Sequence, residues 1–158
     1  MRVWLCIAAA NGFIATVMGA IAAHLMAGQP WYSARQWVEI GAEYQMAHAL
    51  ALLAVAVLSG RAAGAGRRWL TAAAWSFVAG IVLFSGTLFA MGLGGLTGLG
   101  AVVPLGGLAF LVGWAALFYA GLRHFARPGK DATPARPPAR EEPAREASAD
   151  EAPGRPSD

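Results

Sequence analysis

Two histidines, and a short polar run around the second, are the residues of this chain best suited to chemistry. His24 lies near the end of a long apolar stretch, and His48 closes the run Glu43-Tyr44-Gln45-Met46-Ala47-His48. Imidazole titrates near physiological pH and is a common metal ligand. Ionisable side chains inside a membrane are costly and often functional. One hypothesis is therefore a proton-handling or metal-binding cluster of His24, Glu43 and His48, with Tyr44 and Gln45 close by.

The alternative hypothesis is that these side chains hold two helices together. If the first two helices are antiparallel neighbours, both histidines lie at similar depth on the outer side. Tyr44 and His48 are four residues apart, so their side chains can touch. An interhelical hydrogen bond here is worth roughly 0.6–2 kcal/mol. We favour this packing role, because only two histidines and one nearby carboxylate are available and no HExxH-type spacing occurs.

Catalysis is not expected, and neither is a metal or another cofactor. A catalytic site needs an activated nucleophile or a fuller metal shell, and the sequence offers neither. Glu39 and Glu43 could pair as acid and base, but Arg35 shares their helical face, which favours a solvated charged surface. Cys6 is the single cysteine, so an internal disulfide and a cysteine metal cluster are excluded.

The elements that position these residues are apolar runs of membrane-spanning length. The chain is 57% hydrophobic and 13% charged, whereas an ordinary soluble domain is about 25% charged. About 20 apolar residues cross the hydrocarbon core. The first run is too long for the core of a signal peptide, so we expect it to be retained. We predict an all-α domain over residues 1–125, a four-helix transmembrane bundle with helices at about 3–27, 33–59, 69–91 and 101–125.

The second helix is expected to begin with an interfacial helical segment. Ser33 and Gln36 form a capping box, and the residues up to Glu43 are amphipathic. Four aromatic residues typical of the lipid–water boundary lie around this segment: Trp31, Tyr32, Trp37 and Tyr44.

The C-terminal residues 126–158 differ from the rest of the chain. They hold seven of the nine prolines and lack aromatic and bulky aliphatic side chains. Such a segment cannot bury enough apolar area to offset its chain entropy, so we predict a disordered tail.

Basic residues predict the orientation in the membrane. With four spans, both termini and the middle loop share one side, which carries seven basic residues: Arg2, Arg61, Arg67, Arg68, Arg123, Arg127 and Lys130. The other side carries Arg35 alone. Loops rich in Lys and Arg stay in the cytoplasm, so we expect an inner (plasma) membrane protein with both termini cytoplasmic. The net charge of +3 and the absence of a basic helix argue against nucleic acid as a partner.

Asn11 is expected near mid-membrane, bonded to a residue of the third or fourth helix such as Ser76, Ser85 or Thr87. A pore-lining role for Asn11 is the alternative. Glycine and alanine recur every four residues on several helices, which favours a compact bundle over a wide channel.

Four stretches of the sequence together resemble the small membrane proteins of the domain-of-unknown-function 423 family. They are Gly19-Ala20-Ile21-Ala22-Ala23-His24, Glu43-Tyr44-Gln45-Met46-Ala47-His48-Ala49-Leu50, Leu83-Phe84-Ser85-Gly86-Thr87-Leu88, and Pro104-Leu105-Gly106-Gly107 with Gly113-Trp114 beyond. The likeness covers nearly all of residues 5–125. Ile21 and Ala22 stand where the family usually has phenylalanine and glycine.

The resemblance implies a four-helix topology and a membrane location, and it implies no reaction. It also indicates which positions the family pattern emphasises: His24, Tyr44, Gln45, His48, Ser85, Gly86, Pro104 and Gly107. Because these positions come from all four helices, they are expected to converge in one polar core.

The expected function is that of a non-enzymatic structural, accessory or assembly protein. Its partners are the lipid bilayer and either another membrane protein or further copies of itself. The alternative is a small transporter or channel-like protein that uses an outer-side His/Glu cluster.

Overall fold

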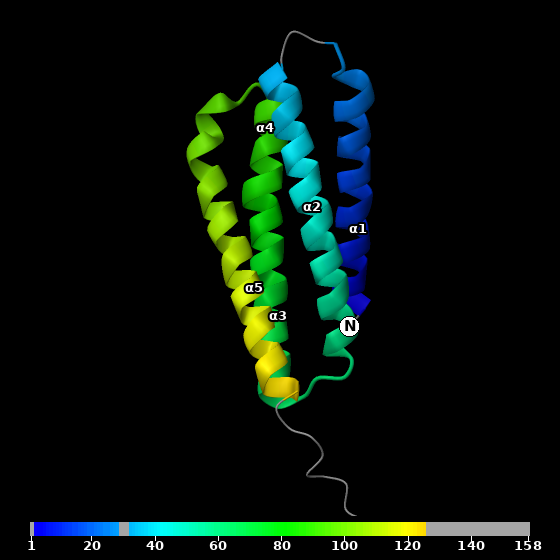
Figure 1. The fold of residues 1–158 in the computed structure, drawn as a ribbon, viewed down its shortest axis with the longest axis vertical. Helices are drawn as coiled ribbons and strands as arrows, with labels where there is room; N and C mark the ends of the chain where they lie inside the picture. Colours follow the sequence, from blue (N-terminus) through cyan, green and yellow to red (C-terminus); the bar gives the residue numbers. More distant parts are fainter. Residues whose placement is uncertain (1, 29–31, 126–158) are drawn as a thin grey trace, which may run out of the picture. The chain divides into compact units, whose positions relative to one another are not determined.

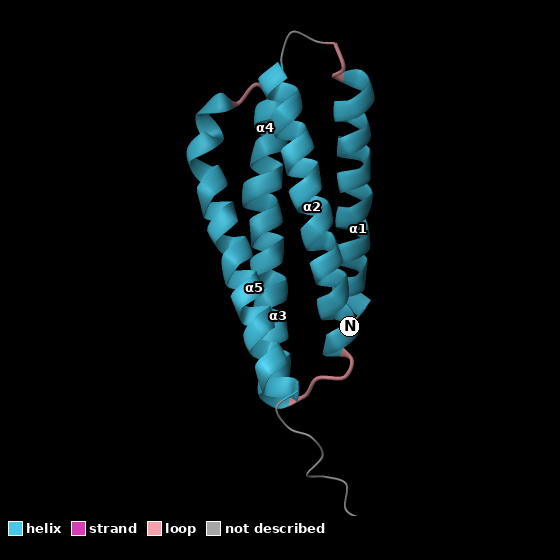
Figure 2. Ribbon diagram, viewed as in Figure 1, coloured by secondary structure: helices cyan, strands magenta, loops and turns pink. Residues whose placement is uncertain are grey.

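The computed structural model describes residues 2–28 and 32–125, and these form a bundle of long helices joined by short loops (Figures 1 and 2). The predicted tail, 126–158, lies outside the described residues. Within the described ranges, four helical segments are long and apolar enough to cross a membrane: Arg2–Leu25, Ser33–Ser59, Gly64–Gly94 and Thr97–Leu122. The predicted all-α, four-helix transmembrane fold is confirmed.

The first two spans form an antiparallel hairpin. The first consists of α1 (Arg2–Ala20) and a π-helical turn, η1 (Ile21–Leu25). The second is α2 (Tyr32–Ser59), a continuous helix that includes the segment predicted to be interfacial. Nε of Arg35 donates to Oε1 of Glu39 over 2.8 Å, one turn further along, as their spacing predicts.

The third span is a single rod of three segments: α3 (Gly64–Gly80), the π-helical η2 (Ile81–Gly86) and α4 (Thr87–Gly94). The rod begins before the apolar run, so its first turn carries Arg67 and Arg68. It ends at Gly95, whose φ of +67° is the left-handed conformation that terminates many helices. The 3₁₀ turn η3 (Thr97–Val102) then leads into α5 (Val103–Phe125).

The helices pack mainly in two pairs, α1 with α2 and α3 with α5, and α2 also lies against η2 and α4 (Figure 1). The core centres on fully buried side chains of α2 and α3, including Leu52, Val55 and Phe77. Only Ala8 and Ala15 of α1 are buried. Large apolar side chains such as Phe13 instead lie exposed on its outer face, which suits contact with lipid.

Candidate functional site

His48 lies in the interior of the bundle, 5% exposed, and both of its ring nitrogens have partners. Nδ1 is 2.7 Å from the backbone carbonyl oxygen of Tyr44, and Nε2 is 3.2 Å from the indole Nε1 of Trp114 on α5. A carbonyl oxygen only accepts hydrogen bonds, and an indole nitrogen only donates them. Nδ1 therefore carries the proton and Nε2 is the acceptor, which is one tautomer of the neutral ring.

Aromatic rings from three helices enclose this imidazole. The ring of Phe110 stacks on it with a centroid separation of 3.5 Å and an interplanar angle of 11°. Phe77 of α3 lies 5.6 Å away and Trp114 6.0 Å away, both with tilted rings. The ring of Tyr44 lies 6.1 Å away on α2 itself. We call His48, Tyr44, Phe77, Phe110 and Trp114 the histidine cluster.

Glycines on the two facing helices make room for these rings. Gly80 of α3 faces the ring of Phe110 on α5, and Gly113 of α5 faces the ring of Phe77 on α3. A Cβ at Gly113 would lie 2.5 Å from Cε1 of Phe77, closer than atoms pack in proteins. Each glycine thus lets a ring from the opposite helix approach the backbone, which brings α3 and α5 close together.

A second polar group joins α1 to α2. Nε2 of Gln45 donates to Oδ1 of Asn11 over 2.9 Å, and Nδ2 of Asn11 donates to the carbonyl oxygen of Ile7. The predicted partner of Asn11 on the third or fourth helix was therefore wrong. Ser85, fully buried, lies in η2, and π-helical turns of this kind are frequent at functional sites.

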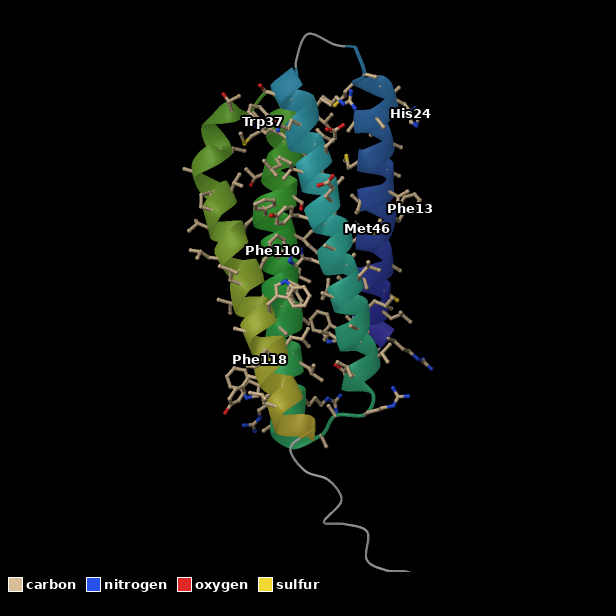
Figure 3. The ribbon with its side chains drawn as sticks, in the orientation of Figure 1. Phe13, His24, Trp37, Met46, Phe110 and Phe118 are labelled. Atoms are coloured by element: carbon tan, nitrogen blue, oxygen red, sulfur yellow. The ribbon has the colours of Figure 1, made fainter. Side chains whose placement is uncertain are left out.

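His24 and Glu43 do not join the buried polar residues. Both side chains are exposed, and Figure 3 shows His24 at the far end of the hairpin, directed away from the other helices. The bond between Asn11 and Gln45 sets the register of α1 against α2. His24 lies 13 residues after Asn11 on the first span. That is more than three helical turns, or about 20 Å at 1.5 Å per residue.

The prediction that both histidines lie at similar depth is therefore wrong. His48 lies on the opposite side of the Asn11–Gln45 level from His24, which adds to their separation. The error arises because the residues up to Glu43 are interpreted as an interfacial segment, which puts His48 near the outer start of the span, whereas α2 is one continuous helix from Tyr32 to Ser59. Of the six candidate residues, Tyr44 and His48 contact rings of the third span, Gln45 contacts α1, and Ser85 is buried in η2.

The contact between Tyr44 and His48 was predicted from their spacing, and it is present. The remaining members of the histidine cluster, Phe77, Phe110 and Trp114, were missed. In an apolar helix such rings look like ordinary lipid-facing or core residues. The glycines at Gly80 and Gly113 were the available signal, since each provides the space that a ring from the facing helix occupies.

The arrangement offers little for metal or acid–base chemistry. Within residues 2–28 and 32–125, no three His, Cys, Asp or Glu side chains come together as a metal site. The lone pair of His48 Nε2 is already used by Trp114. A ligand or proton at that nitrogen would have to displace the indole.

The model of the family described as "Protein of unknown function (DUF423)" matches residues 18–107, more than half of the chain. The chain belongs to the DUF423 family. The matched segment includes Gln45, His48 and Ser85, and the resemblance inferred from the sequence is confirmed.

Curated relatives of this DUF423 chain are themselves described only as membrane proteins. The UPF0382 membrane protein YwdK of Bacillus subtilis is 37% identical over 124 residues, which cover 78% of this chain and 99% of that protein. A UPF0382 membrane protein of Haemophilus influenzae is 36% identical over 76% of this chain and 94% of its own length. The UPF0382 inner membrane protein YgdD of Escherichia coli K12 is 35% identical over 77% of this chain and 91% of its own length. No solved structure matches the chain.

Proposed function

We propose that the protein is a non-enzymatic structural or accessory protein of the membrane, and that its characteristic polar residues serve helix packing. One observation carries this proposal: both ring nitrogens of His48 are bonded within the bundle, to Tyr44 and Trp114. An imidazole used in this way joins α2 to α5 and offers no free lone pair to a substrate.

The inner membrane location and the orientation belong to the same proposal. The relative YgdD of Escherichia coli is named an inner membrane protein. The first and third spans begin with Arg2, Arg67 and Arg68, whereas the second begins with Arg35. One side of the membrane therefore has three of these arginines and the other side has one. This bias supports a cytoplasmic position for the N-terminus and for the loop between α2 and α3.

The transporter alternative has less support. It requires His24, Glu43 and His48 at one outer-side site, but His24 and Glu43 are exposed and His24 lies several turns from His48. We therefore propose a protein partner, or a second copy of the chain, rather than a transported ion.

Two measurements on the full chain test the proposal. Purification from native membranes in mild detergent should recover a membrane-protein partner, or a homo-oligomer, in fixed stoichiometry. Liposomes containing the purified protein and a pH-sensitive dye should leak protons no faster than empty liposomes. Flux that disappears in His48→Phe, while the variant stays folded, would contradict the accessory role and favour transport.

A further inference from the structure

The orientation of the Gln45 side chain is fixed by a chain of hydrogen bonds. The carbonyl oxygen of Ile7 only accepts, so the amide nitrogen of Asn11, 2.9 Å away, must face it. Oδ1 of Asn11 then accepts from Nε2 of Gln45, also over 2.9 Å. Oε1 of Gln45, a strong acceptor, is left on the other branch of the amide.

Two buried polar atoms in the described residues lack a hydrogen-bond partner: Oε1 of Gln45 and Oγ of Ser85. Gln45 is 3% exposed and Ser85 is 0% exposed. Leaving such a group unpaired costs about 1–3 kcal/mol, and membrane lipid offers no substitute partner. Each of the two residues therefore needs a hydrogen-bond partner inside the bundle.

The packing places Gln45 and Ser85 at one level of the bundle. The second and third spans are antiparallel, and Gly41 of α2 lies against Leu88 and Phe89 of α4. One turn further along α2, the ring of Tyr44 lies 4.6 Å from that of Phe84. Gln45 and Ser85 immediately follow these two residues in the sequence.

Ser85 also lies on the side of the third span that faces α2. Ile81, Ser85 and Leu88 are all buried and follow one side of this rod. Leu88 packs against the backbone of α2 at Gly41. The hydroxyl of Ser85 is thus in the layer between the two helices. Gln45 follows Gly41 by four residues, so it lies on the same side of α2, although its amide nitrogen reaches Asn11 on α1.

We propose that a buried water molecule bridges Oε1 of Gln45 and Oγ of Ser85. Oε1 needs a donor, a hydroxyl can donate and accept, and water does both. Buried waters typically join polar groups that would otherwise be unpaired. The site connects α1, α2 and η2 through Asn11, Gln45 and Ser85. It is separate from the histidine cluster and does not depend on the proposed accessory role.

The test is proton-detected solid-state NMR of the full ¹⁵N-labelled chain in lipid bilayers, with magnetisation transferred from water protons. The side-chain amide of Gln45 should receive a cross-peak from water. The backbone amides of Leu52 and Val55, which lie in the apolar core, should receive none at the same mixing time. In Ser85→Ala the Gln45 cross-peak should disappear.

Ser76→Ala is the matched control, because Ser76 lies on the same span more than two turns before Ser85. This control should keep the cross-peak. If Ser85→Ala does not fold, Gln45→Leu replaces it. In that variant the water cross-peak to the backbone amide of Ser85 should disappear. No water cross-peak to Gln45 in the unmodified protein overturns the proposal in favour of a direct contact. A cross-peak that survives in folded Ser85→Ala, or at Ser85 in Gln45→Leu, also overturns it.

Discussion

Trp114 donates its indole N–H to Nε2 of His48 over 3.2 Å, which links α5 to α2 across the interior of the bundle. The two residues are far apart in the sequence, and each belongs to a different helix pair. The bond therefore holds the pair of α1 and α2 against the pair of α3 and α5.

The first prediction concerns the energy of this bond. Trp114→Phe keeps a ring but removes the donor, and His48→Phe keeps a ring but removes the acceptor. A double-mutant cycle on the free energy of unfolding should give a coupling of roughly 0.6–1.7 kcal/mol, the range for interhelical hydrogen bonds in membranes. Trp75→Phe, at an exposed tryptophan of α3, is the control and should show no coupling to His48→Phe. Additive effects of Trp114→Phe and His48→Phe would mean that the bond contributes nothing.

The second prediction separates the two histidines. His48→Ala leaves a cavity beside the stacked ring of Phe110 and should lower the free energy of unfolding by about 2–4 kcal/mol. His24→Ala alters an exposed side chain and should change it by less than about 0.5 kcal/mol. Unfolding in detergent or bilayers, monitored by helicity or by trapping the open state, measures both values. Equal losses in the two variants would disprove the separate placement of the histidines.

The third prediction tests the close approach at Gly113. Gly113→Ala places a methyl group 2.5 Å from the ring of Phe77, so the ring or helix must move, at a cost of about 1–3 kcal/mol. Gly107→Ala on the same helix meets nothing within 4 Å. It should leave the free energy of unfolding unchanged or raise it slightly, because alanine favours helix. If Gly113→Ala proved as harmless as Gly107→Ala, the packing of α3 against α5 described above would be incorrect.

The fourth prediction concerns orientation. In a Cys6→Ala background, Thr97→Cys lies in the turn before α5, and Arg61→Cys lies in the loop after α2. A membrane-impermeant maleimide should label Thr97→Cys in intact spheroplasts. It should label Arg61→Cys only after the membrane is opened. The reverse pattern would place the arginine-rich end outside, contrary to the proposed topology.

The sequence alone predicted the four spans well, because lipid imposes long apolar runs and their breaks are marked by glycine, proline and arginine. It also predicted the contact of Tyr44 with His48, which depends only on helical spacing. The depth of His24 relative to His48 was not predictable in the same way. It depends on the register of α2 against α1, which the bond between Asn11 and Gln45 sets and which the sequence does not indicate.

The partners of the buried polar groups were the least predictable part. Asn11 bonds to Gln45 in the adjacent helix, although the predicted partners were serines and a threonine of the third span. Trp114 reaches His48 because Gly80 and Gly113 allow α5 to lie close to α3, which packs against α2. Such choices follow from the register between helices, which a single sequence does not reveal.

The tautomer of His48 tests the central claim most directly, since that claim is that both ring nitrogens are engaged in packing. ¹⁵N NMR of the labelled imidazole in lipid bilayers at neutral pH distinguishes the two nitrogens. We predict a neutral ring with the proton on Nδ1 and an unprotonated Nε2 that accepts from Trp114, and a change at Nε2 in Trp114→Phe. A proton on Nε2, in either the other neutral tautomer or the charged ring, would contradict the account.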